Sequence, residues 1–353
     1  MKKTKRELLV LAAATTVALS MGVTVQAKGD EKVLNFGCQM YTDGCVNSAN
    51  DENGGWNAMR YGIAEALFKF DDDMEVIPWL AESYEVNDEH TEWTIKLKDG
   101  IKFSDGCDLT PTKVKEYFDH MKEVGPSGSA KPEKYLEFEA EVTVDDDANT
   151  INIKTSKPYA NLVGQLCHPT MGITDVEHIE NYDNGIIGTG PYKIESWDEG
   201  QAITLVKNED YFKGEPSIDK IVFKIVPDDN AKALQLKSGE LDLALLTPKD
   251  AAAFADDEAY TCYDMKTSDY RGIMFNFGNE YWQKNRDLIP AVCYGLDRQA
   301  IIDAVILGQG MPAYGPLQRN IYNYEDVEHY DYNPEKAKEI LEAAGCEMGD
   351  DGF

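Results

Sequence analysis

The chain has 353 residues and carries 64 acidic against 34 basic residues, which gives a formal net charge of −30. This balance excludes a nucleic-acid-binding protein, because such proteins need a basic surface to displace counterions from phosphates. It argues equally against adsorption to anionic lipid. Hydrophobic residues make up 42% of the chain, which is enough for packed cores, and the length predicts two or three domains.

The first 27 residues are predicted to be a cleaved export signal. Residues 2–6 carry four basic side chains, residues 8–23 are apolar, and residues 25–27 read Val-Gln-Ala, the small-residue pattern that a signal peptidase accepts. A membrane anchor is the alternative, but the apolar stretch is short for a span. No cysteine directly follows it, so a lipobox is not evident. We expect an exported protein in the periplasmic space or at the outer face of the cytoplasmic membrane.

Cysteine and histidine residues give no indication of a metal site. The seven cysteines have no metal-type spacing, and the five histidines are dispersed. A disulfide between Cys38 and Cys45 stays open for an exported chain. We therefore expect no metal and no other cofactor.

Strand and helix patterns alternate in the first half of the chain. Residues 32–37 are predicted to form a strand, and residues 54–68 a helix with apolar residues on one face. Residues 93–97 alternate between apolar and polar, as in a strand, and Asp99-Gly100 then predicts a hairpin turn leading to Ile101 and Phe103. A second turn is expected at Asp105-Gly106.

The next elements are a helix and a hairpin. Thr110-Pro111 is typical of a helix start, with threonine as N-cap and proline in the first turn. Residues 138–154 predict a hairpin whose acidic run, Asp145 to Asp147, is a solvated turn. A calcium loop would need a glycine and a distal glutamate that this run lacks.

The second half predicts an α/β sheet. Strands are expected at 192–197, 202–206 and 220–226. A helix at 228–237 and a strand at 241–246 follow, and together they indicate a crossover connection. Further elements are expected as a strand at 271–277 and helices at 285–293, 297–307 and 334–344.

Motifs for covalent catalysis are missing. The sequence has no nucleophile elbow, no zinc-protease motif and no phosphate-binding loop. Gly188-Thr189-Gly190 precedes Pro191, which cannot donate the amide that a phosphate-binding helix start needs. We predict that the protein is not an enzyme and does not cleave peptides. A secreted hydrolase with an unrecognised site is the alternative from another class.

Several segments carry a family resemblance when they are taken in order. They are Ala64-Glu65-Ala66-Leu67, Val76-Ile77-Pro78-Trp79-Leu80-Ala81-Glu82-Ser83, residues 93–106, Gly188-Thr189-Gly190-Pro191-Tyr192-Lys193, residues 208–212, Ser238-Gly239-Glu240-Leu241-Asp242, residues 297–301 and residues 334–338. In this order they resemble the peptide- and nickel-type extracellular solute-binding proteins of ABC importers, family 5. One departure stands at the helix after Thr110, where the family usually has an acidic residue and this chain has Pro111-Thr112-Lys113.

The resemblance implies an α/β, two-lobed periplasmic-binding-protein-like fold of type II with an extra β-rich subdomain. Residues 28–55 and 187–265 would form the first lobe, and residues 56–186 the inserted subdomain. Residues 266–353 would begin the second lobe. Family members continue beyond that point, so we expect the second lobe to be incomplete and ligand binding by this chain to be weak.

The resemblance also implies a function. The protein would capture dipeptides or oligopeptides in the cleft between the lobes and deliver them, as a monomer, to an ABC permease in the membrane. A nickel chelate or another small solute is the alternative ligand. Strand edges would pair with the peptide backbone. The expected contacts are the segment after the first strand (Cys38, Gln39, Met40 and Tyr41), and Tyr270 and Asn276; Phe275 is as well explained by core packing.

Overall fold

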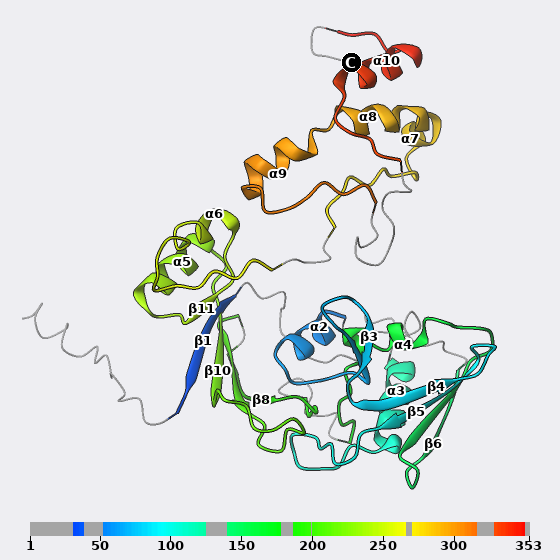
Figure 1. Ribbon diagram of the computed structural model, residues 1–353, viewed down its shortest axis with the longest axis vertical. Coiled ribbons are helices and arrows are strands. Elements are labelled where there is room, and N and C mark those ends of the chain that lie inside the picture. Colours follow the sequence, from blue (N-terminus) through cyan, green and yellow to red (C-terminus); the bar gives the residue numbers. More distant parts are fainter. Residues whose placement is uncertain are drawn as a thin grey trace, which may run out of the picture. The chain divides into compact units, whose positions relative to one another are not determined.

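The structure is a computed structural model (Figure 1). It describes residues 31–38, 52–124, 140–177, 186–198, 200–265, 270–315 and 328–349. The chain divides into two units, Met1–Lys32 and Val33–Phe353, and every helix and strand described lies in the second. The predicted export signal and residues 39–51 lie outside the described residues. Within the described ranges, no helix is long and apolar enough to cross a bilayer.

A five-stranded sheet is built from the start of the second unit and from residues 192–244. Its order is β11-β1-β10-β9-β8. The strands are β1 (Val33–Cys38), β8 (Tyr192–Asp198), β9 (Ala202–Lys207), β10 (Lys220–Ile225) and β11 (Leu243–Ala244). Strand β1, drawn in blue in Figure 1, runs parallel to β10 and β11, whereas β9 is antiparallel to β10 and β8.

Helix α5 (Asp229–Ser238) connects β10 to β11, so the predicted crossover is confirmed. The sequence defines both ends of this helix. The Asp228 carboxylate accepts a hydrogen bond from the amide of Ala231 (2.7 Å), and Gly239 ends the helix with a φ of 79°. Strand β11 is shorter than predicted. Just before it, the Asp242 carboxylate accepts hydrogen bonds from the amide and side chain of Asn35, and the Asp242 amide donates to the Asn35 carbonyl.

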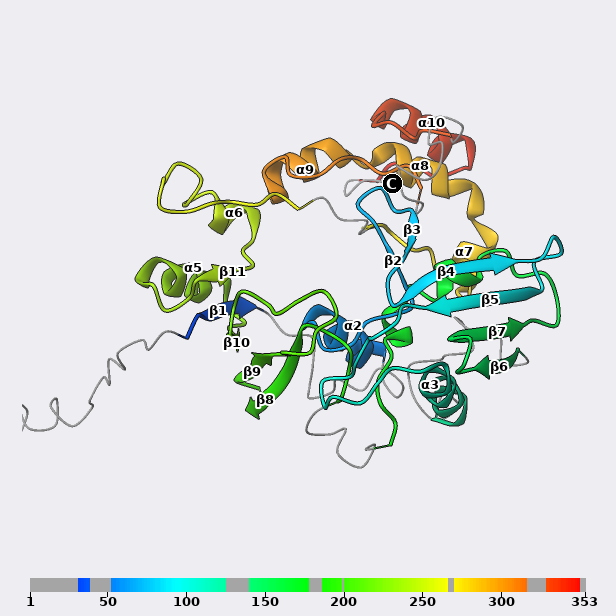
Figure 2. The same cartoon turned by 60° about the horizontal axis from the view of Figure 1, so that its bottom comes forward.

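A four-stranded antiparallel sheet follows β1 in the chain. Figure 2 shows its order, β4-β5-β7-β6, with helix α3 beside it. The elements are β4 (Ala81–Val86), β5 (Glu92–Leu97), α3 (Pro111–Val124), β6 (Glu141–Asp145) and β7 (Thr150–Lys154). The predicted alternation in β5 is confirmed, since Trp93, Ile95 and Leu97 are buried and their neighbours are exposed. Their side chains share one core with the buried face of α3.

The start of α3 explains the missing acidic residue of the family pattern. The Thr110 hydroxyl caps the helix by accepting from the amide of Lys113 (3.3 Å), as predicted. Asp146, in the turn between β6 and β7, accepts from the amide of Thr112 (3.0 Å) and from its hydroxyl (2.7 Å). The acidic turn, residues 145–147, is exposed as expected. It also places the Asp146 carboxylate at the N-terminus of α3, where a negative charge is favourable.

Two predictions around this sheet are wrong. The helix predicted at 54–68 is α2 (Glu52–Arg60); Gly62 then takes a φ of 69°, and the chain continues into β2 (Phe68–Phe70), which pairs with β3 (Val76–Pro78). Residues 63, 64 and 66–68 are all buried, so their helix-like spacing reflects burial of a whole segment rather than one helical face.

Asp99-Gly100 forms a turn with Gly100 at a φ of 74°, but not the predicted hairpin. Strand β5 pairs with β4 and β7 instead. Ile101 and Phe103 are buried in the core outside any strand, so their apolar character reports on packing and not on strand pairing.

Helices dominate the described residues after 270. They are α7 (Glu280–Lys284), α8 (Ile289–Gly295), which continues the 3₁₀ turn η4 (Arg286–Leu288), α9 (Arg298–Ile306) and α10 (Pro334–Ala343). Asp297 and Asn333 cap α9 and α10, and α10 packs against α8. The strand predicted at 271–277 is not formed. None of the described strands pairs with this extended segment, and its Met274 side chain is 94% exposed.

Candidate functional site

The carboxyl ends of three parallel strands meet at one edge of the five-stranded sheet. Cys38 ends β1, and the amide of Val226, just after β10, donates to the Cys38 carbonyl (3.0 Å). The amide of Leu245, just after β11, donates to the Gly37 carbonyl (3.1 Å). In open α/β sheets, ligands bind outside the carboxyl ends of such strands, which makes this edge the first candidate site.

Cys38 contributes backbone rather than side chain to this edge. Its side chain is buried in a hydrophobic cluster with Ala58, Tyr61 and Phe223. Burial raises the pKa of the Cys38 thiol to about 11, although the positive charge of Lys232 acts in the opposite direction. Cys38 is a free thiol in the structure, and its possible partner Cys45 lies outside the described residues. A raised pKa disfavours the thiolate, which is the nucleophilic form of cysteine.

A buried lysine supports the same edge. Lys232 on α5 is only 2% exposed, and its ammonium group donates to the Leu245 carbonyl (2.8 Å) and pairs with the Asp229 carboxylate (2.8 Å). The pairing offsets the cost of burying a charge. Gly37 permits this packing, because a Cβ at that position would collide with the Leu241 side chain.

No contact between described residues links the other predicted ligand-binding residues to this edge of the sheet. Gln39, Met40 and Tyr41 lie outside the described residues. Tyr270 is exposed, and the Asn276 side chain accepts from the amide of Gly278 (2.9 Å) in a local turn before α7. Among the described residues, no hydrogen bond or ion pair joins Cys38 to Tyr270 or Asn276.

An aromatic and cationic cluster on α2 was not predicted from the sequence. Trp56 is exposed, the guanidinium carbon of Arg60 lies 5.1 Å from its ring centroid, and the His168 ring meets it edge-on at 5.8 Å. The other face of α2 is buried at Ala58, and the ring of the adjoining Tyr61 packs at a tilt against that of Phe223, with centroids 4.7 Å apart, so α2 lies on the five-stranded sheet. The signal available in the sequence was Trp56 and Arg60 at helical spacing.

Several of the family motifs meet at one buried carboxylate. The Oε1 atom of Glu65 accepts from the Trp79 indole (2.8 Å) and from the Tyr211 hydroxyl (2.8 Å), and Oε2 accepts from the Thr189 hydroxyl (3.2 Å). Burial raises the pKa of Glu65, and the three hydrogen bonds partly oppose this shift. This network joins segments up to 146 residues apart, so the motifs build a structural joint between distant parts of the chain.

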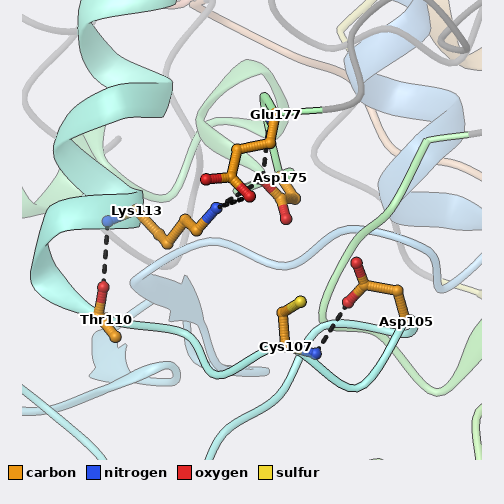
Figure 3. Close-up of polar contacts among 6 residues, drawn as sticks. All are labelled: Asp105, Cys107, Thr110, Lys113, Asp175 and Glu177. Atoms are coloured by element: carbon orange, nitrogen blue, oxygen red, sulfur yellow. Dashed lines mark hydrogen bonds and ion pairs between the residues drawn. The ribbon is translucent and has the colours of Figure 1, made fainter.

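One group of side chains has the composition of a metal site. Ligand atoms of Asp105, Cys107 and Asp175 lie within 4.8 Å of one another. Figure 3 shows Lys113 reaching from α3 to Asp175 (3.2 Å) and Glu177 (2.8 Å). A metal ion would compete with this ammonium group, and the negative charge of Asp105 raises the pKa of the Cys107 thiol. The geometry fits a salt-bridged loop contact better than a metal centre.

Comparison with known proteins agrees with this architecture. Residues 75–353 match the family described as bacterial extracellular solute-binding proteins, family 5 Middle. The chain belongs to family 5 of the bacterial extracellular solute-binding proteins. The family predicted from the sequence is thereby confirmed.

Individual relatives give the extent of the similarity. The glutathione-binding protein GsiB of Salmonella typhi is 30% identical over 298 residues, which cover 83% of this chain and 57% of GsiB. The crystal structure of NikZ from Campylobacter jejuni in complex with Ni(L-His) matches with a TM-score of 0.78 at 25% identity, over 91% of this chain and 64% of NikZ. DppA from Helicobacter pylori, solved with the peptide STSA, shares the fold with a TM-score of 0.70 at 22% identity, over 90% of this chain and 67% of DppA.

These structures confirm the α/β fold of type II periplasmic binding proteins. The chain spans little more than half the length of the curated relatives it matches.

Proposed function

We propose that this chain is the solute-binding component of an ABC importer, and that it captures a dipeptide or oligopeptide outside the cytoplasm for delivery to a membrane permease. The family match over residues 75–353 carries the proposal. A curated relative named for binding glutathione, itself a short peptide, favours a peptide ligand. The importer partner and a monomeric state are part of this proposal.

The carboxyl edge of the five-stranded sheet suits a peptide ligand. Strand β11 stands at the end of the sheet order, and Leu243 on it and Leu245 just after it are exposed. An edge strand offers unpaired backbone groups to an extended peptide, and exposed apolar side chains beside it give contact area. We place the peptide backbone here, with Cys38 to Tyr41 as neighbours and with Tyr270 and Asn276 on the opposing side of the ligand.

A nickel chelate is the second candidate, because NikZ was solved with Ni(L-His) and is similar over 91% of this chain. The two ligand classes are separated by calorimetry with purified protein. A pool of dipeptides and tripeptides including glutathione is titrated in one arm, and Ni(II) with L-histidine in the other. Saturable heat with peptides alone supports the proposal, and saturable heat with the nickel chelate alone replaces it with the second candidate.

Trp56 is expected to contribute to peptide binding. Its exposed ring and the adjacent Arg60 guanidinium belong to α2, the helix that lies on the five-stranded sheet. Trp56→Ala should weaken binding of the best peptide roughly tenfold, the order of one aromatic contact. Phe70→Ala is the matched control, because Phe70 is 41% exposed where Trp56 is 40%. Equal affinity of both variants and the parent protein would remove Trp56 from the site.

Export is tested by the N-terminus of the secreted protein. The basic head, the apolar stretch and Val25-Gln26-Ala27 predict cleavage after Ala27. Edman sequencing or mass spectrometry of protein recovered outside the cytoplasm should show Lys28 as the first residue. Protein that keeps Met1 and sediments with membranes would contradict cleavage and indicate an anchor.

A further inference from the structure

Three lysines gather around one tryptophan in a chain whose net charge is −30. The Nζ atom of Lys69, on β2, lies 3.6 Å from the ring centroid of Trp79, and that of Lys213 lies 4.0 Å from the same centroid. Lys98, which follows β5, lies 5.9 Å from it and 5.8 Å from the ring centroid of Phe212. Three distant segments thus bring ammonium groups to one aromatic surface.

None of these three lysines forms an ion pair with a described residue. The two nearby carboxylates make their direct contacts with other groups: Glu65 is buried and accepts three hydrogen bonds, and Glu82 pairs with Lys96 at 2.7 Å. Both still attract Lys98 electrostatically, so three ammonium groups face two carboxylates here. Other lysines of the two sheets, in contrast, form ion pairs with a neighbouring carboxylate, as Lys154 does with Glu92 and Lys220 with Glu195. The cluster therefore has a local excess of positive charge.

The lysines are held in place although they repel one another. The Lys98 ammonium donates to the carbonyl of Trp79, and the ring itself attracts the ammonium groups of Lys69 and Lys213. Burial lowers the pKa of Lys98, and the positive charges of Lys213 and Lys69 act in the same direction, whereas the carboxylates of Glu65 and Glu82 oppose the shift. An anion placed among these groups would relieve the repulsion at little cost in side-chain ordering.

We propose that the Trp79 cluster (Lys69, Trp79, Lys98, Phe212 and Lys213) binds a multiply charged oxyanion of the phosphate class. Lys98 and Lys213 are its principal counter-charges, Lys69 adds to the field, and the rings of Trp79 and Phe212 form the apolar floor. Lysine suits this role, because its ammonium group acts as a compact point charge toward phosphate oxygens. None of these five residues belongs to the peptide-binding edge proposed above.

The location predicts a consequence for stability. Lys69 and Lys98 come from the segments around the four-stranded sheet, whereas Lys213 follows β9 of the five-stranded sheet. A bound oxyanion would bridge the two, and a ligand that binds only the folded protein raises its melting temperature with concentration.

The test uses calorimetry and thermal unfolding of the full chain with inorganic phosphate, with citrate, and with sodium chloride at matched ionic strength. We expect saturable binding of phosphate, a rise in melting temperature, and no saturable response to chloride. Citrate binding with equal strength would assign the site to multiply charged oxyanions in general, whereas phosphate binding alone narrows it to phosphate; both support the site. Identical responses to all three salts would overturn it.

Variants locate the effect. Lys98→Gln and Lys213→Gln should each weaken phosphate binding about tenfold, the order of one charge-assisted hydrogen bond, and Lys98→Arg should retain binding. Lys157→Gln, which removes an exposed lysine elsewhere on the β-rich part, should bind as the parent does. If Lys98→Gln or Lys213→Gln does not fold, Lys69→Gln tests the loss of a charge beside Trp79, with Lys98→Arg as the variant that keeps the charge. Unchanged affinity in folded Lys98→Gln and Lys213→Gln would overturn the proposal.

Discussion

Replacing Glu65 with alanine is expected to lower the free energy of unfolding by about 3 kcal/mol. The substitution removes the acceptor of three hydrogen bonds, from the Trp79 indole, the Tyr211 hydroxyl and the buried Thr189 hydroxyl. Their donors would be left without a protein partner in a region mostly closed to water. Because these groups come from distant segments, the loss acts on the joint between the two sheets and not on one element alone.

Urea denaturation followed by tryptophan fluorescence measures this effect. The urea concentration at the midpoint of unfolding is compared between proteins, provided that the slope of free energy against urea is unchanged. Glu65→Gln keeps an oxygen for Trp79 and Tyr211 and should cost only about 1 kcal/mol. Glu82→Ala is the control for loss of an exposed carboxylate; its pair with Lys96 is half exposed, so we expect less than about 1 kcal/mol. An equal loss in Glu65→Ala and Glu82→Ala would contradict a structural role for Glu65.

The same residue predicts a pH dependence. Burial raises the pKa of Glu65 in the folded protein above its ordinary value. Between the unfolded pKa and the folded pKa, the folded state therefore holds a proton that the unfolded state has released. The stability contributed by this proton is complete below the unfolded pKa and is lost as pH rises through the folded pKa. The parent protein should therefore gain stability relative to Glu65→Gln as pH falls from above the folded pKa of Glu65 to its unfolded pKa. A constant difference between the two across this range would contradict the raised pKa.

Gly190→Ala is expected to destabilise the fold by about 3 kcal/mol. A Cβ at this position would collide with the Gly62 carbonyl oxygen and would lie 2.8 Å from the Ile63 carbonyl oxygen. Both are backbone atoms, so no side-chain rotation relieves the contact. The amide of Gly190 also donates to the Ile63 carbonyl (2.9 Å), and moving this segment away would break that bond. The glycine pattern before Pro191 thus serves close backbone approach.

Gly295→Ala is the matched control, because a Cβ there lies 3.9 Å from Ala337 and the residue ends α8 without a positive φ. Thermal or urea unfolding of both variants gives the comparison. We expect little change or a slight gain for Gly295→Ala, since alanine has the higher helix propensity. A Gly190→Ala protein as stable as its parent would show that the segments near residues 62 and 190 can separate without cost.

Local signals were enough to predict much of the secondary structure and the family. The caps at Asp228, Asn333 and Gly239 act on residues within one helical turn, and the alternation in β5 follows from one buried face. Such features depend on neighbours along the chain, which the sequence displays directly. The family was accessible for a related reason: its motifs are short segments in a fixed order.

Contacts between distant segments were decided by the tertiary structure. The partners of Glu65 stand 14, 124 and 146 residues away, and the carboxylate at the N-terminus of α3 comes from Asp146, 34 residues from Thr112. No local pattern records which donor will face a buried carboxylate. The end of α2 at Arg60 was missed because a fully buried segment shows the same apolar spacing as a helix. The lysines around Trp79 follow no spacing either, because they are brought together only when the two sheets pack.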